Sequence, residues 1–301
     1  MRKQRGAEVR WFVRCAVGAS LMLCAAGLAA AWIGSGVQLP SATARDGSLI
    51  TLNRYVNEPV PDVVLVGSSL TFRLKEEYFA TPRVRNLALA GGSPLTGLAI
   101  IANRSRIPRI VLVETNVLSR SMDIALVEKY SKDDSARAWF VRPIRSAVAL
   151  YENWMHAPPT REQAAQTRAR LLDQPPVQFD NAVYVDRAFQ QLDADEQTSS
   201  VRENTERIRR LAVLLEQRGA RVLLVEVPYM GRIEEARSVK ATRAIIHTAF
   251  PEQDRWLRLV VDSSELRWAD GVHLDERSAL IVSRAVDDAL KALPLPAPPA
   301  K

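Results

Sequence analysis

A short apolar run that turns abruptly into glycine and serine constrains this chain more than any other feature. The stretch Asp62–Leu74 reads D-V-V-L-V-G-S-S-L-T-F-R-L. Four apolar, mostly β-branched residues predict a buried parallel strand, and the amphipathic residues after Gly67-Ser68-Ser69 predict a helix. Ligands of open parallel sheets bind outside the carboxyl ends of the strands. Each serine therefore either caps the helix, as serine commonly does, or takes part in chemistry at that edge.

Length and charge limit the class of protein. The 301 residues are enough for one α/β domain with additional segments. The formal net charge is +7, of which five cations and one anion in residues 1–14 supply +4 and leave +3 for the rest. No basic stripe stands out after this tail, so a nucleic-acid surface is not expected.

The basic tail precedes a run without charged residues, Cys15–Ile33. Nineteen helical residues rise about 28 Å, close to the thickness of the hydrocarbon core of a bilayer. The run predicts a transmembrane anchor, with residues 1–14 in the cytoplasm and the main domain on the periplasmic or extracytoplasmic side. A signal peptide cleaved near Ala29–Ala31 is the alternative. Both cysteines, Cys15 and Cys24, lie in this run, so the exported domain has no disulfide and no thiol nucleophile.

The rest of the chain alternates strand and helix patterns. Residues 34–58 are expected to form a linker, 59–293 the main domain and 294–301 a disordered tail. The expected strands are 63–66, 84–87, 110–113, 222–227 and 257–261. The expected helices are 71–78, 95–103, 200–218 with a capping box at Ser200 and Glu203, 234–248 and 276–293. This order predicts an α/β sandwich with about five parallel strands.

Residues 120–200 interrupt this alternation with prolines and aromatic residues, among them Trp139, Phe140, Tyr151 and Trp154. We expect a helical insertion. Its aromatic residues either shape a substrate groove or form a small hydrophobic core of their own.

One of the three histidines lies in a pattern that suits catalysis. His273 ends the sequence Asp270-Gly271-Val272-His273, in a loop between the last expected strand and the last helix. An acid three residues before a histidine on a turn can hold one ring nitrogen and leave the other to act as a base. Alternatively, Asp270 only caps a turn. His156 and His247 are expected to be structural.

These loops together contain the parts of an acyl-transfer site. Ser69 is the candidate nucleophile, His273 the base and Asp270 the acid that orients it. The backbone N–H groups of Ser69 and Gly91 and the side-chain amide of Asn116 are candidate oxyanion donors. All of them follow expected strands, so one crevice can hold them. No cofactor and no metal are expected.

Four short blocks occur in the order that is found in the SGNH/GDSL hydrolase superfamily, which the chain resembles. The blocks are Gly67-Ser68-Ser69, Asn86–Gly91, Glu114-Thr115-Asn116 and Asp270–His273. The resemblance implies a flavodoxin-like three-layer α/β/α fold, a nucleophile at Ser69, and oxyanion donors at Gly91 and Asn116. Three positions depart from the usual blocks: Ser68 replaces Asp, Glu114 replaces Gly, and Val117 replaces the Asp that often follows the third block.

The anchor and the Gly-Ser-Ser block resemble the branch of this superfamily that modifies envelope polysaccharides, which includes alginate O-acetylation proteins and the D-alanyl transfer protein of teichoic acids. The resemblance implies an acyl group that is carried on Ser69 and passed to, or removed from, a sugar hydroxyl. It also implies a multispanning membrane acyltransferase as partner. The alternatives are a plain esterase acting on small acyl esters and a catalytically inactive membrane-anchored scaffold for polysaccharide assembly.

Overall fold

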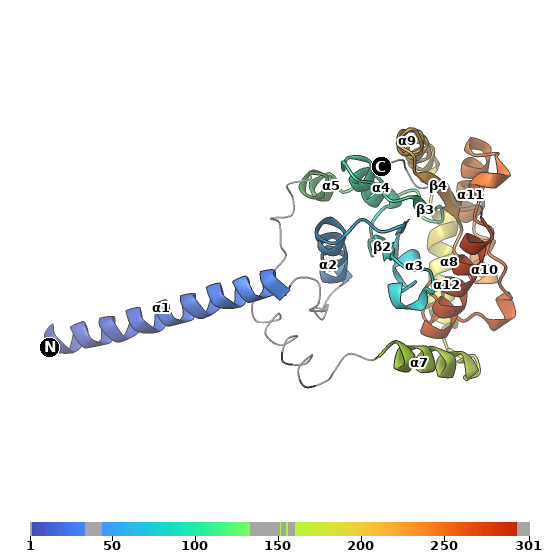
Figure 1. Ribbon diagram of the computed structural model, residues 1–301. Helices are drawn as coiled ribbons and strands as arrows, with labels where there is room; N and C mark the ends of the chain where they lie inside the picture. The colour runs from blue at the N-terminus through green and yellow to red at the C-terminus, as the bar shows by residue number, and fades with distance from the viewer. Residues whose placement is uncertain (1, 34–43, 133–150, 152–154, 156–159, 294–301) are drawn as a thin grey trace.

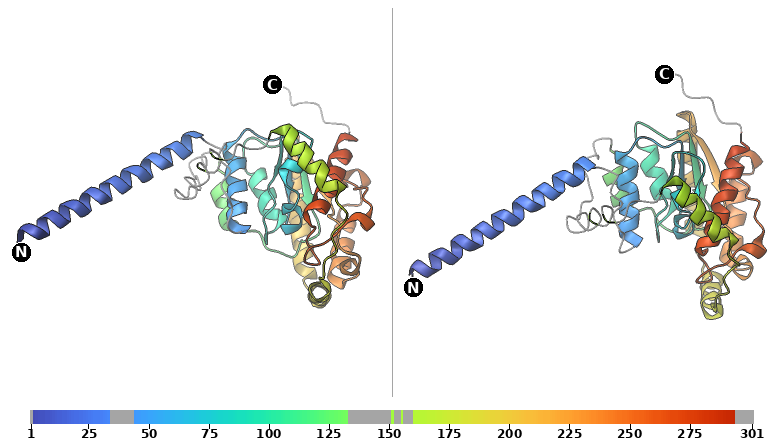
Figure 2. Two further views of the ribbon diagram at one scale, coloured as in Figure 1. Left: turned by 90° about the horizontal axis from the view of Figure 1, so that it is seen from below. Right: turned by 60° about the horizontal axis from the view of Figure 1, so that its bottom comes forward.

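The computed structural model describes residues 2–33, 44–132, 151, 155 and 160–293 (Figure 1). The expected tail 294–301 lies outside these residues, as do three of the aromatic residues of the insertion and His156. Helix α1 (Arg2–Ile33) extends away from the rest of the described structure, as the views of Figures 1 and 2 agree. Among the described residues, no helix is both long enough and apolar enough to cross a membrane. The run Cys15–Ile33, which was expected to form a transmembrane anchor, lies within α1.

The centre of the fold is a parallel sheet with the strand order β2-β1-β3-β4. Its strands are β1 (Val63–Val66), β2 (Val84–Asn86), β3 (Ile110–Glu114) and β4 (Arg221–Val225). Val63 of β1 is in register with Val84 of β2 and with Ile110 of β3. The chain adds β2 on one side of β1 and then β3 on the other, so the order reverses between β1 and β3. Open α/β sheets place their ligand crevice at such a point.

Helices cover both faces of the sheet, because alternate strand residues point into two separate cores. Val64 and Val66 of β1 pack in the core that contains residues of α2, α4 and α9, whereas Val63 and Leu65 pack in the core that contains residues of α3, α10 and α12. The helices on the first face are α2 (Ala44–Asn57), α4 (Pro94–Ala102) and α9 (Thr198–Gln217). Those on the second are α3 (Ser69–Phe72), α10 (Gly231–Glu234) and α12 (Glu276–Lys291). The predicted α/β class with a parallel sheet is confirmed.

The fifth strand, expected at 257–261, is wrong. Trp256 forms only an isolated parallel bridge with Leu224, and the Leu257 N–H donates to the Leu224 carbonyl at 2.8 Å. The chain then leaves β4, and Val260 is 93% exposed. A run rich in leucine and valine thus predicted a strand in a segment that pairs with the sheet at its start only.

The linker expected at 34–58 is wrong over most of its length. Residues 44–57 form α2, and Leu52, Tyr55 and Val56 are buried in the core of the α/β unit. The spacing of these three residues is helical, but the polar start of the segment hid it. Residues 34–43 lie outside the described part.

Several helix boundaries also differ from expectation. Helix α9 begins after Gln197 without a side-chain cap, so the capping box at Ser200 is wrong, although Gly219 ends the helix at a φ of +88° as expected. The helix expected from Thr71 is divided into α3 and a 3₁₀ turn at Glu76–Tyr78. The helix expected at 234–248 becomes α10 and α11 (Arg237–Ala249).

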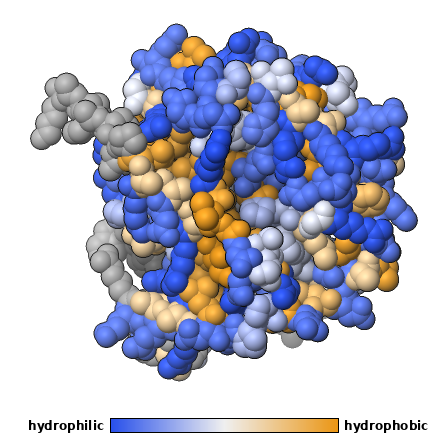
Figure 3. All heavy atoms as spheres, turned by 90° about the vertical axis from the view of Figure 1, so that its right-hand side faces the viewer, coloured by the Kyte–Doolittle hydropathy of each residue, from blue (hydrophilic) through white to orange (hydrophobic). Residues whose placement is uncertain are grey.

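The described part of the insertion contains α5 (Ile124–Tyr130), α7 (Arg161–Asp173) and α8 (Ala182–Ala194). Its exposed apolar side chains include Val177, Val183, Tyr151 and Tyr184. Figure 3 views the side of the molecule that is on the right in Figure 1, and a band of hydrophobic residues crosses that hydrophilic face. Because Tyr151 and Tyr184 are exposed, they are not part of a small buried core of the insertion. Such a core was one of the two expectations for its aromatic residues.

Candidate active site

The two serines after β1 have different roles. Ser68 is fully buried and caps α3, because its Oγ accepts the Leu70 N–H at 3.2 Å. Ser69 is the first residue of α3 and is partly exposed. The capping role and the availability for chemistry, which were alternatives in the sequence, thus belong to adjacent residues.

Ser69, His273 and Asp270 form a continuous hydrogen-bonded chain. The Ser69 Oγ lies 2.8 Å from His273 Nε2, and His273 Nδ1 lies 2.7 Å from Asp270 Oδ2. These distances allow His273 to hold a proton on Nδ1 toward the carboxylate and to accept the serine proton on Nε2. The structure thereby brings the predicted residue Ser69 to the predicted pair Asp270 and His273, which follow it by about 200 positions in the chain.

A tight loop holds Asp270 and His273. Trp268 and Leu274 form an antiparallel bridge, and the Ala269 N–H donates to the His273 carbonyl at 2.9 Å. Gly271 has a φ of +85°, and a Cβ there would lie 2.8 Å from Cγ2 of Val185 in α8. Both the backbone conformation and the contact thus require glycine. The loop therefore packs directly against a helix of the insertion.

Hydrogen bonds fix the charge of Asp270. Its Oδ1 accepts the backbone N–H groups of Val272 at 3.2 Å and of His273 at 2.8 Å. Burial is the largest single influence and raises the pKa of Asp270, but the hydrogen bonds from the backbone and ring of His273, the charge of that ring and the Val272 N–H together lower the pKa below its usual value. The carboxylate is thus ionised at neutral pH and can stabilise an imidazolium.

Two backbone N–H groups are available to an oxyanion. Within the part of the chain that the structure describes, neither the Ser69 N–H nor the Gly91 N–H has a hydrogen-bond acceptor. Gly91 is exposed at a φ of +77°. Its segment is joined to the turn that carries the candidate nucleophile Ser69 (the nucleophile turn), because the Leu89 N–H donates to the Gly67 carbonyl at 3.0 Å.

The third expected oxyanion donor, Asn116, is bound elsewhere. Its Nδ2 donates to the Val227 carbonyl at 2.8 Å, and its Oδ1 accepts the Val227 N–H at 2.8 Å. Asn116 lies at the expected edge of the sheet, but its two bonds to Val227 hold the amide in place and leave at most the second N–H of Nδ2 for an oxyanion.

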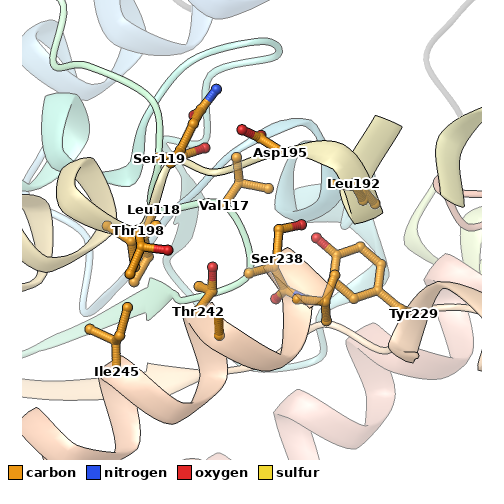
Figure 4. A pocket seen from close by; sticks show the side chains of 15 residues that line it. Val117, Leu118, Ser119, Leu192, Asp195, Thr198, Tyr229, Ser238, Thr242 and Ile245 are labelled. Carbon is orange, nitrogen blue, oxygen red and sulfur yellow. The ribbon is translucent and has the colours of Figure 1, made fainter. Parts of the chain in front are cut away.

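A small cavity lies beside Asn116 (Figure 4). Its lining side chains come from the loop after β3, from the ends of α8 and α9, from Tyr229 and from α11. Its volume is about 50 Å³, which accommodates a few water molecules but not a sugar ring. This cavity is therefore not a polysaccharide groove.

The remaining histidine that the structure describes has structural contacts. His247 stacks on Trp256 with ring centroids 3.9 Å apart, and its Nε2 lies 3.0 Å from Glu226 Oε1. Within the described residues, no group of three His, Cys, Asp or Glu side chains is arranged to hold a metal ion.

Sequence reasoning missed the role of Glu114, which it noted only as a departure from the third block. The structure buries this carboxylate against the nucleophile turn. The available signal was an acidic residue that directly ends a run of four apolar strand residues, because an acid in such a place needs several hydrogen-bond donors.

The chain was compared with known proteins. No protein-family model matches it, and no curated protein matches it either.

Proposed function

We propose that this chain is a serine acyl-transfer enzyme of the SGNH type, which carries an acyl group on Ser69. One observation carries the proposal: the chain of hydrogen bonds from Ser69 Oγ through the His273 ring to Asp270, with distances of 2.8 Å and 2.7 Å. A nucleophile, its base and the group that orients the base are the minimum for this chemistry. The position of Ser69 just after β1, where the strand order reverses, also supports it.

In the first half of the reaction, Ser69 Oγ attacks the carbonyl carbon of an ester while His273 Nε2 takes the hydroxyl proton. The charged carboxylate of Asp270 stabilises the imidazolium, and the N–H groups of Ser69 and Gly91 donate to the oxyanion. The imidazolium then gives its proton to the leaving alcohol as the carbon–oxygen bond breaks. The product of this half is an ester of Ser69.

In the second half, an incoming hydroxyl group attacks this ester and gives its proton to His273 Nε2. Collapse of the tetrahedral intermediate returns the proton to Ser69 and releases the new ester. The acceptor decides the type of enzyme: a sugar hydroxyl makes it an O-acyltransferase, and water makes it an esterase. We place the acceptor among envelope or exopolysaccharide sugars because of the resemblance of the four blocks. Competition between an added oligosaccharide and water for the acyl group distinguishes the two types.

The proposed location is the cytoplasmic membrane, with the α/β unit outside the cytoplasm and a multispanning acyltransferase as partner. Its support is the cluster of cations before the uncharged run Cys15–Ile33. Membrane fractionation of the full chain and of a variant that lacks residues 2–33 tests this location. Recovery of both in the soluble fraction would contradict it.

The proposed chemistry is tested with a serine-reactive fluorophosphonate probe and with p-nitrophenyl acetate. We expect labelling and acetate release by the full chain, and loss of both in Ser69→Ala. Ser264→Ala is the matched control, because Ser264 is exposed and its hydroxyl donates to Asp262 in the same turn. A folded wild-type protein that neither labels nor releases acetate would instead favour the inactive scaffold.

A further inference from the structure

A carboxylate is buried directly behind the nucleophile turn. Glu114 ends β3, and its side chain is fully buried. Within the described residues, no lysine, arginine or histidine forms an ion pair with it. A buried anion without a counter-charge is costly unless hydrogen-bond donors surround it. The donors around the Glu114 carboxylate should therefore show which part of the structure it holds in place.

All the hydrogen-bond donors to Glu114 belong to Ser68 and Thr71, the two residues that flank Ser69 and Leu70. Its Oε2 accepts the backbone N–H groups of Ser68 at 2.7 Å and of Thr71 at 3.2 Å. The Thr71 hydroxyl donates to the same oxygen at 2.7 Å, and the Ser68 hydroxyl donates to Oε1 at 2.7 Å. One carboxylate thus holds both the main chain and the side chains of Ser68 and Thr71.

The carboxylate also accounts for Gly67. A Cβ at that position would lie 2.6 Å from Glu114 Oε2 and 2.6 Å from Thr71 Oγ1. Any side chain there would push the carboxylate away from the turn. Gly67 is therefore required by the space that Glu114 and Thr71 occupy.

The turn needs such support because α3 contains only four residues. A single helical turn is not stable by itself, and its first N–H groups have no partner within the helix. Glu114 takes the N–H groups of Ser68 and Thr71. The Ser69 N–H between them keeps no acceptor among the described residues, and Ser69 Oγ faces His273 Nε2 at 2.8 Å.

We infer that Glu114 is a positioning residue for the nucleophile, whose carboxylate fixes Ser68 and Thr71 so that Ser69 presents its Oγ to His273 and its N–H to the oxyanion. This inference rests on the proposed acyl transfer at Ser69. It assigns Glu114 to the geometry of the reacting serine and to no step of proton transfer.

Four substitutions, two at position 114 and two at position 71, separate positioning from folding. Glu114→Gln has the same shape, and its amide oxygen can still accept the two backbone N–H groups while its NH₂ donates to the Ser68 hydroxyl. Glu114→Ala leaves those N–H groups without an acceptor. Thr71→Val removes one hydroxyl donor at nearly constant shape, and Thr71→Ser is its matched control because it keeps the hydroxyl.

The readout is the rate constant of fluorophosphonate labelling per reactive site, together with kcat and KM for p-nitrophenyl acetate. Normalising to the fraction of protein that finally labels removes the contribution of unfolded molecules. We expect Glu114→Ala to lower the labelling rate constant and kcat by about 100-fold with little change in KM, because small displacements of a nucleophile have effects of that size. Glu114→Gln should stay within about tenfold of the wild type, and Thr71→Val should be slower than Thr71→Ser.

Two results would overturn the inference. In the first, the sites that label in Glu114→Ala react at the wild-type rate. If Glu114→Ala does not fold, the same result in Thr71→Val has the same meaning. Glu114 then supports only folding, and the proposed function still stands. If the folded wild-type protein does not label at all, the proposed function fails and the positioning role fails with it.

Discussion

The loop that carries Ser69 and the loop that carries Asp270 and His273 are held in different ways. The first is attached to the sheet itself, through the buried Glu114 and the backbone bond between Leu89 and Gly67. The second lies at the surface, where the side chains of His273 and Asp270 are 25% and 47% exposed.

The second loop owes its shape to a few local bonds and to the contact of Gly271 with Val185 of the insertion. The comparison indicates that the sheet fixes the position of Ser69, whereas the insertion fixes the position of His273. Substitutions on the two sides should therefore fail in different ways.

The largest effect is expected from His273→Ala. Removal of the base leaves Ser69 in place but without a proton acceptor, so kcat should fall by about 10⁴-fold or more. His247→Ala is the matched control, because His247 contacts Glu226 and Trp256 and not the site. Acetate release is the measurement. Equal losses of kcat in the two variants would contradict the role of His273 as the base.

Gly271→Ala should damage the base side only. The new Cβ combines an unfavourable φ with a contact of 2.8 Å to Val185. We expect the free energy of unfolding to fall by about 1–3 kcal/mol and labelling to slow by about 10- to 100-fold.

Gly219→Ala separates the two causes. Gly219 also has a positive φ, of +88°, but a Cβ there meets nothing within 4 Å. The free energy of unfolding of this variant, measured by chemical denaturation, should fall somewhat, and its labelling rate should not change. If Gly271→Ala labels as fast as Gly219→Ala, the insertion does not position the base.

Asn116→Ala tests which of two roles the amide has. An oxyanion donor would cost about 100- to 1,000-fold in rate. Because the amide already bonds both main-chain groups of Val227, we expect instead a loss of about 1–3 kcal/mol in stability and a labelling rate constant within about tenfold of the wild type. A stable variant with a rate lowered a hundredfold would restore the oxyanion role.

The smallest effect concerns pH. The pKa of Asp270 is lowered on folding, so this group stabilises the folded state above its unfolded pKa of about 3.9. That contribution is lost as the pH falls through the lower, folded pKa. We expect the difference in unfolding free energy between the wild type and Asp270→Asn to shrink below about pH 4. A difference that grows on acidification would contradict the assigned direction of the shift.

The three residues of the candidate site could be selected from sequence because each stands next to a strong local pattern. Ser69 follows four apolar strand residues, and the Asp270–His273 spacing is short enough to bring the two side chains together within one loop. Neither inference needed the distant contacts that finally join the two loops.

The features that were missed depend on tertiary contacts. The buried Glu114 carboxylate accepts hydrogen bonds from a turn that includes Thr71, 43 residues earlier. Only the folded chain brings together the donors that compensate for its burial. Residues 257–261 are mostly leucine and valine, as in a strand, but no sequence pattern says that the segment leaves β4 after Leu257. The polar residues at the start of α2 likewise hid a helix that the core of the α/β unit requires.

The most direct test of the account is to find the acyl group on the protein. The full chain is mixed with p-nitrophenyl acetate, quenched in acid, digested and examined by mass spectrometry. We expect one acetyl ester, on Ser69 of the wild type, and none in Ser69→Ala. In a His273 variant this ester should build up only if that variant can still be acylated. An acetyl group on Ser68, or acetate release by the wild type without any ester on Ser69, would contradict it.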